Sequence, residues 1–220
     1  MTPTDICNLA LSQVPAGPIT NLDEVSVAAR ACKLWYPQCL GELLERGPWR
    51  FAIARQALAV KETNTRPASW EFEYAKPSNL ALLIDVRDSL GSGSQAHDYV
   101  GNSVFSNTPD AVIDFITTAE TSSYYTAQFR AALIALLAAR LCMPITKNMK
   151  REEVLVKASE VAIERAQAAN HNERGTTYGD HIPDILKGRM GLPMDGRIAP
   201  GPEAVYPDFD PVGAFESELG

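Results

Sequence analysis

Trp35-Tyr36-Pro37 and, five residues further on, Glu42-Leu43-Leu44-Glu45-Arg46-Gly47-Pro48-Trp49-Arg50-Phe51-Ala52 form the most informative part of this sequence. They predict a helix that carries large aromatic side chains, is interrupted by a proline and ends at Gly-Pro, with two more aromatics directly after it. Nothing in this stretch is typical of catalysis, so we expect it to pack in a structural core. The residues that we expect to form this core and joint are Trp35, Tyr36, Pro37, Leu43, Leu44, Pro48, Trp49 and Phe51.

Length and composition indicate a globular chain with a sizeable core. The 220 residues are 45% hydrophobic and 21% charged, which is ordinary for a soluble domain with an appendage or for two small domains. The net charge of -7 argues against a protein that binds nucleic acid through a basic face. The longest apolar run, Ala131 to Ala139, is too short to cross a bilayer, and no N-terminal run is typical of a signal peptide. We therefore expect a buried helix there and no membrane association.

The four cysteines give no metal-binding or disulfide pattern. Cys32 and Cys39 would lie two turns apart on one helix, roughly 10 Å, which is too far for a disulfide. Without a signal peptide, free thiols are the default expectation for Cys7 and Cys142 as well.

Two helices are predicted at the N-terminal end. Apolar spacing predicts the first over Thr4–Val14, with Thr4 as its cap. The second should begin near Asn21 and carry apolar residues at helical spacing until Gly47-Pro48. Pro37 lies inside this pattern and should kink the helix or split it.

The periodicity changes to that of β-strands between about Trp70 and Asp114. Residues 70–74 alternate between aromatic and acidic side chains, and residues 80–86 form an apolar run of strand length. Residues 99–105 predict a hairpin around Gly101-Asn102, and residues 112–116 a further strand. We interpret residues 61–119 as a β insertion.

Two alanine-rich helices are predicted after this insertion. The first should start at Ser122 as its cap and end at Pro144, and its apolar residues on most sides indicate burial on most sides. The second should run from about Lys147 to His171, with one small alanine face that permits close helix approach. Residues 1–60 and 120–172 then form a helical body.

Residues 173–220 are predicted to be an extended C-terminal arm. Of the 46 residues from Gly175 onward, 14 are Gly or Pro, a fraction that is typical of irregular structure, and the last twenty carry five acidic residues without Lys or Arg. Scattered apolar residues suggest that the arm orders against a partner, although a loose terminus of no consequence remains open. The candidate docking residues are Ile182, Ile185, Leu186, Met190, Tyr206, Phe209 and Phe215.

The fold class predicted from these elements is α+β and mainly α: a bundle of long helices with a β-strand insertion and an extended C-terminal tail. No chemistry-bearing constellation accompanies it. His97, His171 and His181 show no ligand spacing, and the glycine loop at residues 91–94 lacks the rest of a phosphate-binding fingerprint. Glu42 and Glu45 fit a solvated helix face better than a glycosidase pair. We expect no catalytic residues, no cofactor and no metal.

The order of these motifs resembles a known family. The chain has Pro18-Ile19-Thr20-Asn21-Leu22-Asp23 after its first helix, then Trp35-Tyr36-Pro37, then Pro48-Trp49-Arg50-Phe51-Ala52, then a strand ending in Tyr74-Ala75-Lys76-Pro77-Ser78-Asn79 and a pair of alanine-rich helices. Over roughly residues 5–170 this is similar to the tail tubular protein A family, the head-to-tail adaptors of short-tailed phages. The C-terminal arm takes no part in the resemblance.

The resemblance implies a structural virion protein without catalytic residues. It implies a ring, usually of twelve subunits, between the portal protein and the tail nozzle or tube, located in the virion neck and in the host cytoplasm during assembly. DNA would pass through the lumen without specific binding, and an acidic lumen would repel its backbone. A tail-associated cell-wall hydrolase and a DNA-binding packaging accessory are the competing hypotheses, and the charge of -7 argues against the latter.

Overall fold

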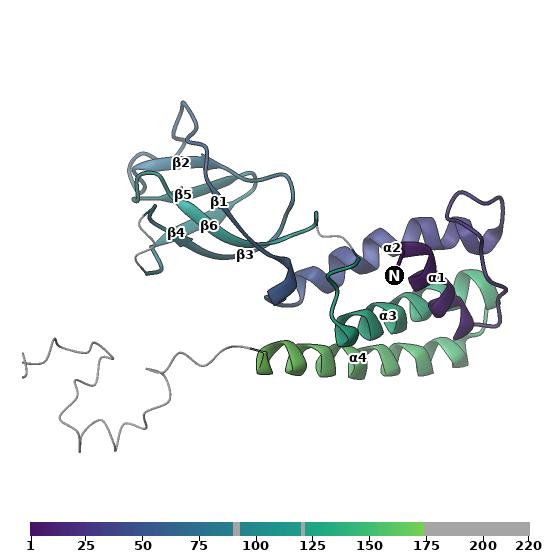
Figure 1. Cartoon of the computed structure of the whole chain (residues 1–220). Coiled ribbons are helices and arrows are strands. Elements are labelled where there is room, and N and C mark those ends of the chain that lie inside the picture. The colour runs from purple at the N-terminus through teal and green to yellow at the C-terminus, as the bar shows by residue number, and fades with distance from the viewer. Residues whose placement is uncertain (90–92, 120–121, 174–220) are drawn as a thin grey trace, which may run out of the picture. The chain divides into compact units, whose positions relative to one another are not determined.

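Along the described part of the chain, two α-helices come first, then all six strands, then two more α-helices (Figure 1). The computed structural model describes residues 1–89, 93–119 and 122–173, which belong to one compact unit, Met1–Glu173. The predicted arm lies outside the described residues except for Glu173. The elements are α1 Pro3–Ser12, α2 Val27–Glu45, the short 3-10 helix η1 Arg50–Ala52, β1 Ile53–Ala57, β2 Phe72–Ala75, β3 Leu80–Arg87, β4 His97–Val100, β5 Ser103–Ser106, β6 Val112–Thr117, α3 Ala127–Thr146 and α4 Met149–Asn172.

The predicted fold class, a mainly α bundle of long helices, is wrong. The structure has four α-helices and two three-stranded antiparallel sheets, with 45% helix and 19% strand among the described residues, which makes it a mixed helix-and-sheet protein. One cause is β1, which lies within the segment that we assigned to the helical body. Its sequence, Ile53–Ala57, does not alternate between apolar and polar residues, and four of its five side chains are exposed.

Helix α3 is the centre of the helical part. It packs against α1, α2 and α4, and nine of its side chains are buried. Helix α3 has 20 residues, and its most apolar stretch has a mean hydropathy of 1.6. By length and composition this is enough to cross a membrane, but 56% of that stretch is buried inside the protein. Because α3 packs against three other helices, its apolar composition is that of a core helix.

The helix ends follow capping chemistry, although not at the predicted residues. Thr2, not Thr4, caps α1 in a capping box with Asp5. Ser26 caps α2, Thr126 rather than Ser122 caps α3, and Asn148 caps α4. Each of these side chains accepts a hydrogen bond from a backbone N–H in the first turn, which would otherwise lack a partner.

Neither internal proline divides its helix. Pro37 lies inside α2 and Pro144 inside α3, so the expected end of α3 at Pro144 is wrong. Both prolines are exposed, and Lys33, whose carbonyl loses its N–H partner to Pro37, is exposed as well. Water can therefore satisfy the freed groups, which reduces the cost of the interruption. Helix α3 ends instead at Lys147, which has a left-handed backbone with φ of 55°.

The strands form two sheets of order β1-β6-β3 and β2-β5-β4, with every pairing antiparallel. The hairpin predicted around Gly101-Asn102 is confirmed, because β4 and β5 pair across it and Gly101 has φ of +60°. The pairing of β1 with β6 joins segments far apart in the sequence, Ile53 opposite Ile116.

Two separate hydrophobic cores result from this topology. One lies among the four helices, and the other is formed by residues of both sheets, including Tyr74, Val104 and Phe115. Strand β6 contributes to both, since Phe115 points into the sheet core and its neighbour Ile116 belongs to the helical core. The strands therefore have a core of their own and also continue the core of the helices.

Candidate functional site

The segment between α2 and β1 is the best-defined joint in the structure. Trp49 is 1% exposed, and its indole N–H donates a hydrogen bond of 2.7 Å to the carbonyl oxygen of Leu43. That carbonyl lies in the last turn of α2, where its backbone partner is the N–H of Arg46 at 3.3 Å. Trp49 therefore ends α2 with its polar edge and fills the helical core with its ring.

Four aromatic rings meet at this joint. The ring of Trp49 lies edge-on to that of Phe129 with 4.8 Å between centroids, and Phe51 contacts Phe129 at 4.7 Å. Tyr125 contacts both phenylalanines at 5.0 and 5.4 Å. Edge-to-face pairs of this kind add roughly 0.5–1.5 kcal/mol each beyond the burial of their area. The cluster joins the end of α2 and η1 to the start of α3.

Helix α4, more than a hundred residues further along the chain, also binds this joint. The side chain of Asn170 accepts a hydrogen bond from the backbone N–H of Arg50 at 2.9 Å and donates one to the carbonyl of Pro48 at 3.1 Å. Gln167 donates to the carbonyl of Arg46 at 2.8 Å. The backbone of residues 46–50 thus obtains through α4 the partners that it lacks in a helix or sheet.

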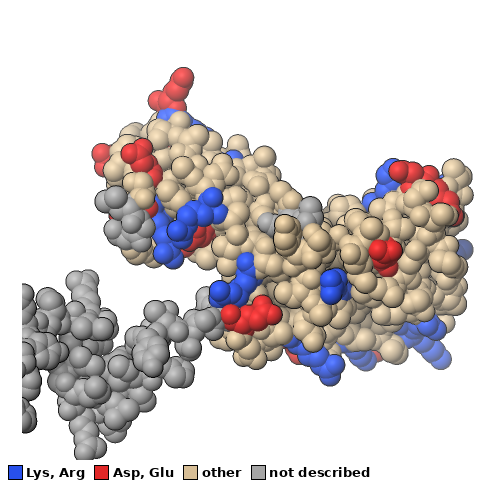
Figure 2. All heavy atoms as spheres, in the orientation of Figure 1, with Lys and Arg blue, Asp and Glu red and all other residues tan. Residues whose placement is uncertain are grey.

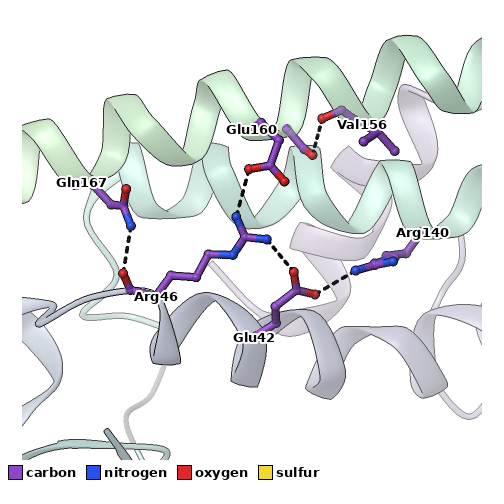
Figure 3. A network of polar contacts seen from close by, with 7 residues as sticks. Glu42, Arg46, Arg140, Val156, Glu160 and Gln167 are labelled. Carbon is purple, nitrogen blue, oxygen red and sulfur yellow. Dashed lines mark hydrogen bonds and ion pairs between the residues drawn. The ribbon is translucent and has the colours of Figure 1, made fainter.

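Ion pairs between charged side chains also link α2 to α3 and α4 (Figure 3). Arg46 contacts Glu42 at 2.7 Å and Glu160 at 2.9 Å, and Glu42 also contacts Arg140 at 3.0 Å. Partial burial of Glu42 acts to raise its pKa. The hydrogen bonds from Arg46 and Arg140 outweigh this effect, so the pKa of Glu42 lies below its usual range. Exposed pairs contribute about 0.2–1 kcal/mol each, so the network orients α2, α3 and α4 more than it stabilises them.

A hollow lies on the outer side of α2, next to this network. The aromatic ring of Trp35 forms one wall, with the guanidinium of Arg140 6.0 Å from its centroid. Gly41 leaves space in it, because a Cβ built at this position would meet no heavy atom within 4 Å. The lining residues are Leu34, Trp35, Pro37, Gln38, Cys39, Gly41, Glu42, Glu45 and Arg140.

The buried carboxylates outside the joint have structural partners. Glu73 accepts hydrogen bonds from Ser103, from the backbone and hydroxyl of Thr65 and from Lys61, and these bonds hold the pKa of Glu73 far below its usual range. Asp114 accepts two bonds from Arg55, which lower the pKa of Asp114. Both carboxylates are therefore fixed as anions in a fully bonded setting, and neither is arranged to exchange a proton with a substrate.

Metal ligands do not gather in the described part of the chain. No group of three or more His, Cys, Asp or Glu residues there could hold a metal ion. The four cysteines are free and buried, and burial raises the pKa of Cys39 to about 12. On the face in Figure 2, Lys and Arg occur beside Asp and Glu, and uncharged side chains cover much of the helical part. That face carries no extended field of one sign.

The structure places the candidate core and joint residues in four different settings. Leu43, Leu44 and Trp49 are buried in the helical core, and Phe51 joins the aromatic cluster. Trp35 and Tyr36 are partly buried against that core from the middle of α2, and Pro37 and Pro48 are exposed. The stretch quoted first is thus divided between the joint and the hollow. The candidate docking residues of the arm, Ile182 to Phe215, lie outside the described residues.

Our sequence reasoning missed most of the polar side chains that complete the joint. Gln167 and Asn170 lie 121 and 120 residues from the backbone groups that they bind. A single sequence carries no signal for pairing at that distance. Arg46 and Glu42 at helical spacing could have been recognised as an i,i+4 pair.

No protein-family model matches the chain, and no curated protein matches it either.

Proposed function

We propose that this protein is a structural head-to-tail adaptor of a short-tailed phage. Copies of it would form a ring, usually of twelve in this family, between the portal protein and the tail nozzle or tube. DNA would pass through the lumen of the ring without specific binding. The protein would act in the virion neck and would be present in the host cytoplasm during assembly.

The observation that carries this proposal is the position of the residues on which the family resemblance rests. Pro48-Trp49-Arg50-Phe51-Ala52 forms the joint between α2 and β1, in which Trp49 and Ala52 are buried. It is held by α3 through an aromatic cluster and by α4 through two hydrogen bonds from and to Asn170. A motif used in this way supports a structural role, because its side chains fix the relative position of helices and sheets instead of meeting a substrate. Such a rigid joint suits a subunit whose function depends on its shape.

The decisive experiment combines the purified full chain with the portal ring of the same phage. We expect particles of the mass of a ring on the portal by light scattering, and a ring density by negative-stain microscopy. The sample without portal is the control for self-assembly. A chain that stays monomeric in both samples and never binds the portal would overturn the proposal.

The cell-wall hydrolase hypothesis is not supported by any arrangement in the described residues, since the buried carboxylates Glu73 and Asp114 are both tied to structural partners. Peptidoglycan hydrolysis by the full chain that is lost in one Asp or Glu variant of normal fold would revive it.

A further inference from the structure

Helix α2 presents an unusual outer face for a helix of a compact unit. Val27 and Leu34 are 68% and 62% exposed, and Gly41, one heptad further on, opens the hollow. Because residues seven apart lie on the same side of a helix, these three positions form one stripe that faces away from the helical core. The stripe is apolar and has an empty site in it.

Helix α4 carries a second stripe of the same spacing. Val154 and Val161 are 66% and 45% exposed, and Ala168 follows seven residues later, also exposed. The buried residues of α4, Ser159, Ile163 and Ala166, lie on the opposite side of the helix. Two flanking helices of one subunit therefore offer heptad-spaced apolar stripes to the outside.

The directions of these helices determine how two copies can meet. Both α2 and α4 pack against α3, and the colours in Figure 1 show that they run the same way, opposite to α3. A second copy in nearly the same orientation would bring its α4 parallel to the α2 of the first copy. Such a head-to-tail contact uses two different surfaces and repeats from copy to copy, so it closes into a ring when the rotation allows.

One register makes every layer of this contact compatible. With Leu34 level with Val161, apolar residues meet apolar residues in four layers and polar residues meet polar residues in two. A shift of one heptad in either direction would set an arginine, Arg151 or Arg165, against Ala31. The layers in the favoured register are Val27 with Val154, Ala31 with Ala158, Leu34 with Val161, Gln38 with Arg165, Gly41 with Ala168, and Glu45 with Asn172.

The charges at the side of the stripe are complementary in the same register. In a parallel pair, the flank of α4 that carries Glu164 faces the flank of α2 beside which Arg140 lies. The side chain of Arg140 is 47% exposed and has Glu42 as an ion-pair partner, so it has room for a second carboxylate. Glu164 is exposed, and the structure records no ion pair for it among the residues described.

We propose that the α2 hollow of one subunit receives Val161 of a second copy, so that α2 and α4 form a parallel, heptad-spaced interface between subunits. The inference rests on the proposed ring and names the surfaces that build it. Val161 would enter the hole between Ala31, Leu34, Trp35 and Gln38, the last three of which line the hollow, and Ala168 would lie over the space that Gly41 leaves.

Site-directed disulfides test the contact in the full chain. The four native cysteines are buried and would not compete. We expect the double variant Leu34→Cys/Val161→Cys to give a ladder of cross-linked multimers under mild oxidation. A mixture of the two single variants should give cross-linked pairs, and each single variant alone should give none. The matched control is Leu34→Cys/Val156→Cys, because Val156 is 44% exposed on the same helix but lies off the stripe.

Substitutions at the same positions test the energetics. Val161→Arg should raise the protein concentration needed for half-assembly by roughly tenfold or more, because a long charged side chain would replace valine against Leu34 and Trp35, whereas Val156→Arg should leave that concentration within about threefold. Gly41→Leu should also block assembly, since its side chain would occupy the space opposite Ala168. A Cβ at position 41 meets no heavy atom within 4 Å in its own subunit, so the far-UV circular dichroism of this variant, like that of the others, should match that of the parent.

The outcomes separate this inference from the proposed function. Rings that form normally but give no Leu34–Val161 cross-link would overturn the α2–α4 contact and leave the adaptor proposal standing. Cross-linking of Leu34→Cys by itself would show a two-fold contact instead. A Val161→Cys thiol that is shielded from maleimide in the dilute monomer would show that the chain's own C-terminal segment covers the stripe. Absence of any assembly, with or without portal, would overturn both proposals.

Discussion

Trp49 should be the residue on which the stability of the joint depends most. Replacement by alanine removes a side chain that is 1% exposed, its edge-on contact with Phe129 at 4.8 Å and its hydrogen bond to Leu43. Buried Trp-to-Ala changes cost about 3–5 kcal/mol. The carbonyl of Leu43 keeps a weaker bond of 3.3 Å from the N–H of Arg46, so the loss of the indole adds little beyond this range.

Urea denaturation would measure this cost. With an m-value of about 2 kcal/mol/M, a loss of about 4 kcal/mol lowers the unfolding midpoint by roughly 2 M. Trp49→Phe keeps an aromatic ring and loses the N–H and some volume, so it should cost about 1–3 kcal/mol. Trp70→Ala is the matched control, because Trp70 is only partly buried and belongs to neither core, and it should cost less than about 1 kcal/mol.

The reasoning would be refuted if Trp49→Ala unfolded within about 1 kcal/mol of the parent chain, or if Trp70→Ala cost as much. The first result would mean that the joint repacks without its central ring. If the adaptor proposal is right, Trp49→Ala should also reduce assembly with the portal at temperatures where the subunit is still folded, because the joint sets the position of the sheets relative to the helices.

Two further predictions concern the cap of α3 and the buried carboxylate of the second sheet. Thr126→Ala should lower the free energy of unfolding by about 1 kcal/mol because it removes the cap of α3, while Ser122→Ala should change it less; thermal unfolding of both variants decides between them, and a larger effect of Ser122 would contradict the observed cap. The folded pKa of Glu73 is lower than its unfolded value of about 4.3, so the ionised carboxylate contributes its full stability above that pH and loses it as the pH falls. The stability difference between the parent chain and Glu73→Gln should therefore be constant above about pH 5 and shrink in acid, and a difference that grows in acid would contradict this sign.

Local elements of the fold were largely predictable from the sequence. Residues 80–86 and 112–116 were expected to be strands and lie in β3 and β6, and the turn at Gly101-Asn102 joins β4 to β5. These segments have patterns that depend on near neighbours: an apolar run of strand length, or a turn that requires a positive φ. The cap of α3 was predicted at Ser122, but Thr126, four residues further on, caps the helix.

Non-local pairing accounts for the errors in the fold class. Strand β1 is mostly exposed and carries no strand pattern of its own, and it pairs with β6 as an antiparallel neighbour, Ala57 opposite Val112. The two sheets then share a core whose members come from β2, β3, β5 and β6, including Tyr74 and Phe115. A short stretch of sequence contains one strand of such a pair but not its partner. We therefore predicted helices with an insertion where the structure has a mixed fold.

The sequence by itself determined that Trp49 and its neighbours are packing residues and that a helix ends just before them. The reason is local: a Gly-Pro pair ends a helix through its own backbone geometry, and large apolar side chains must be buried wherever they lie. Only the tertiary structure decided which residues complete the joint and which remain outside. Asn170 and Gln167 reach residues 46–50 from more than a hundred positions away, and Trp35 and Pro37 border a hollow instead of joining the aromatic cluster. The physical reason is that hydrogen bonds and ring contacts depend on distance in space, which the order of residues along the chain does not specify.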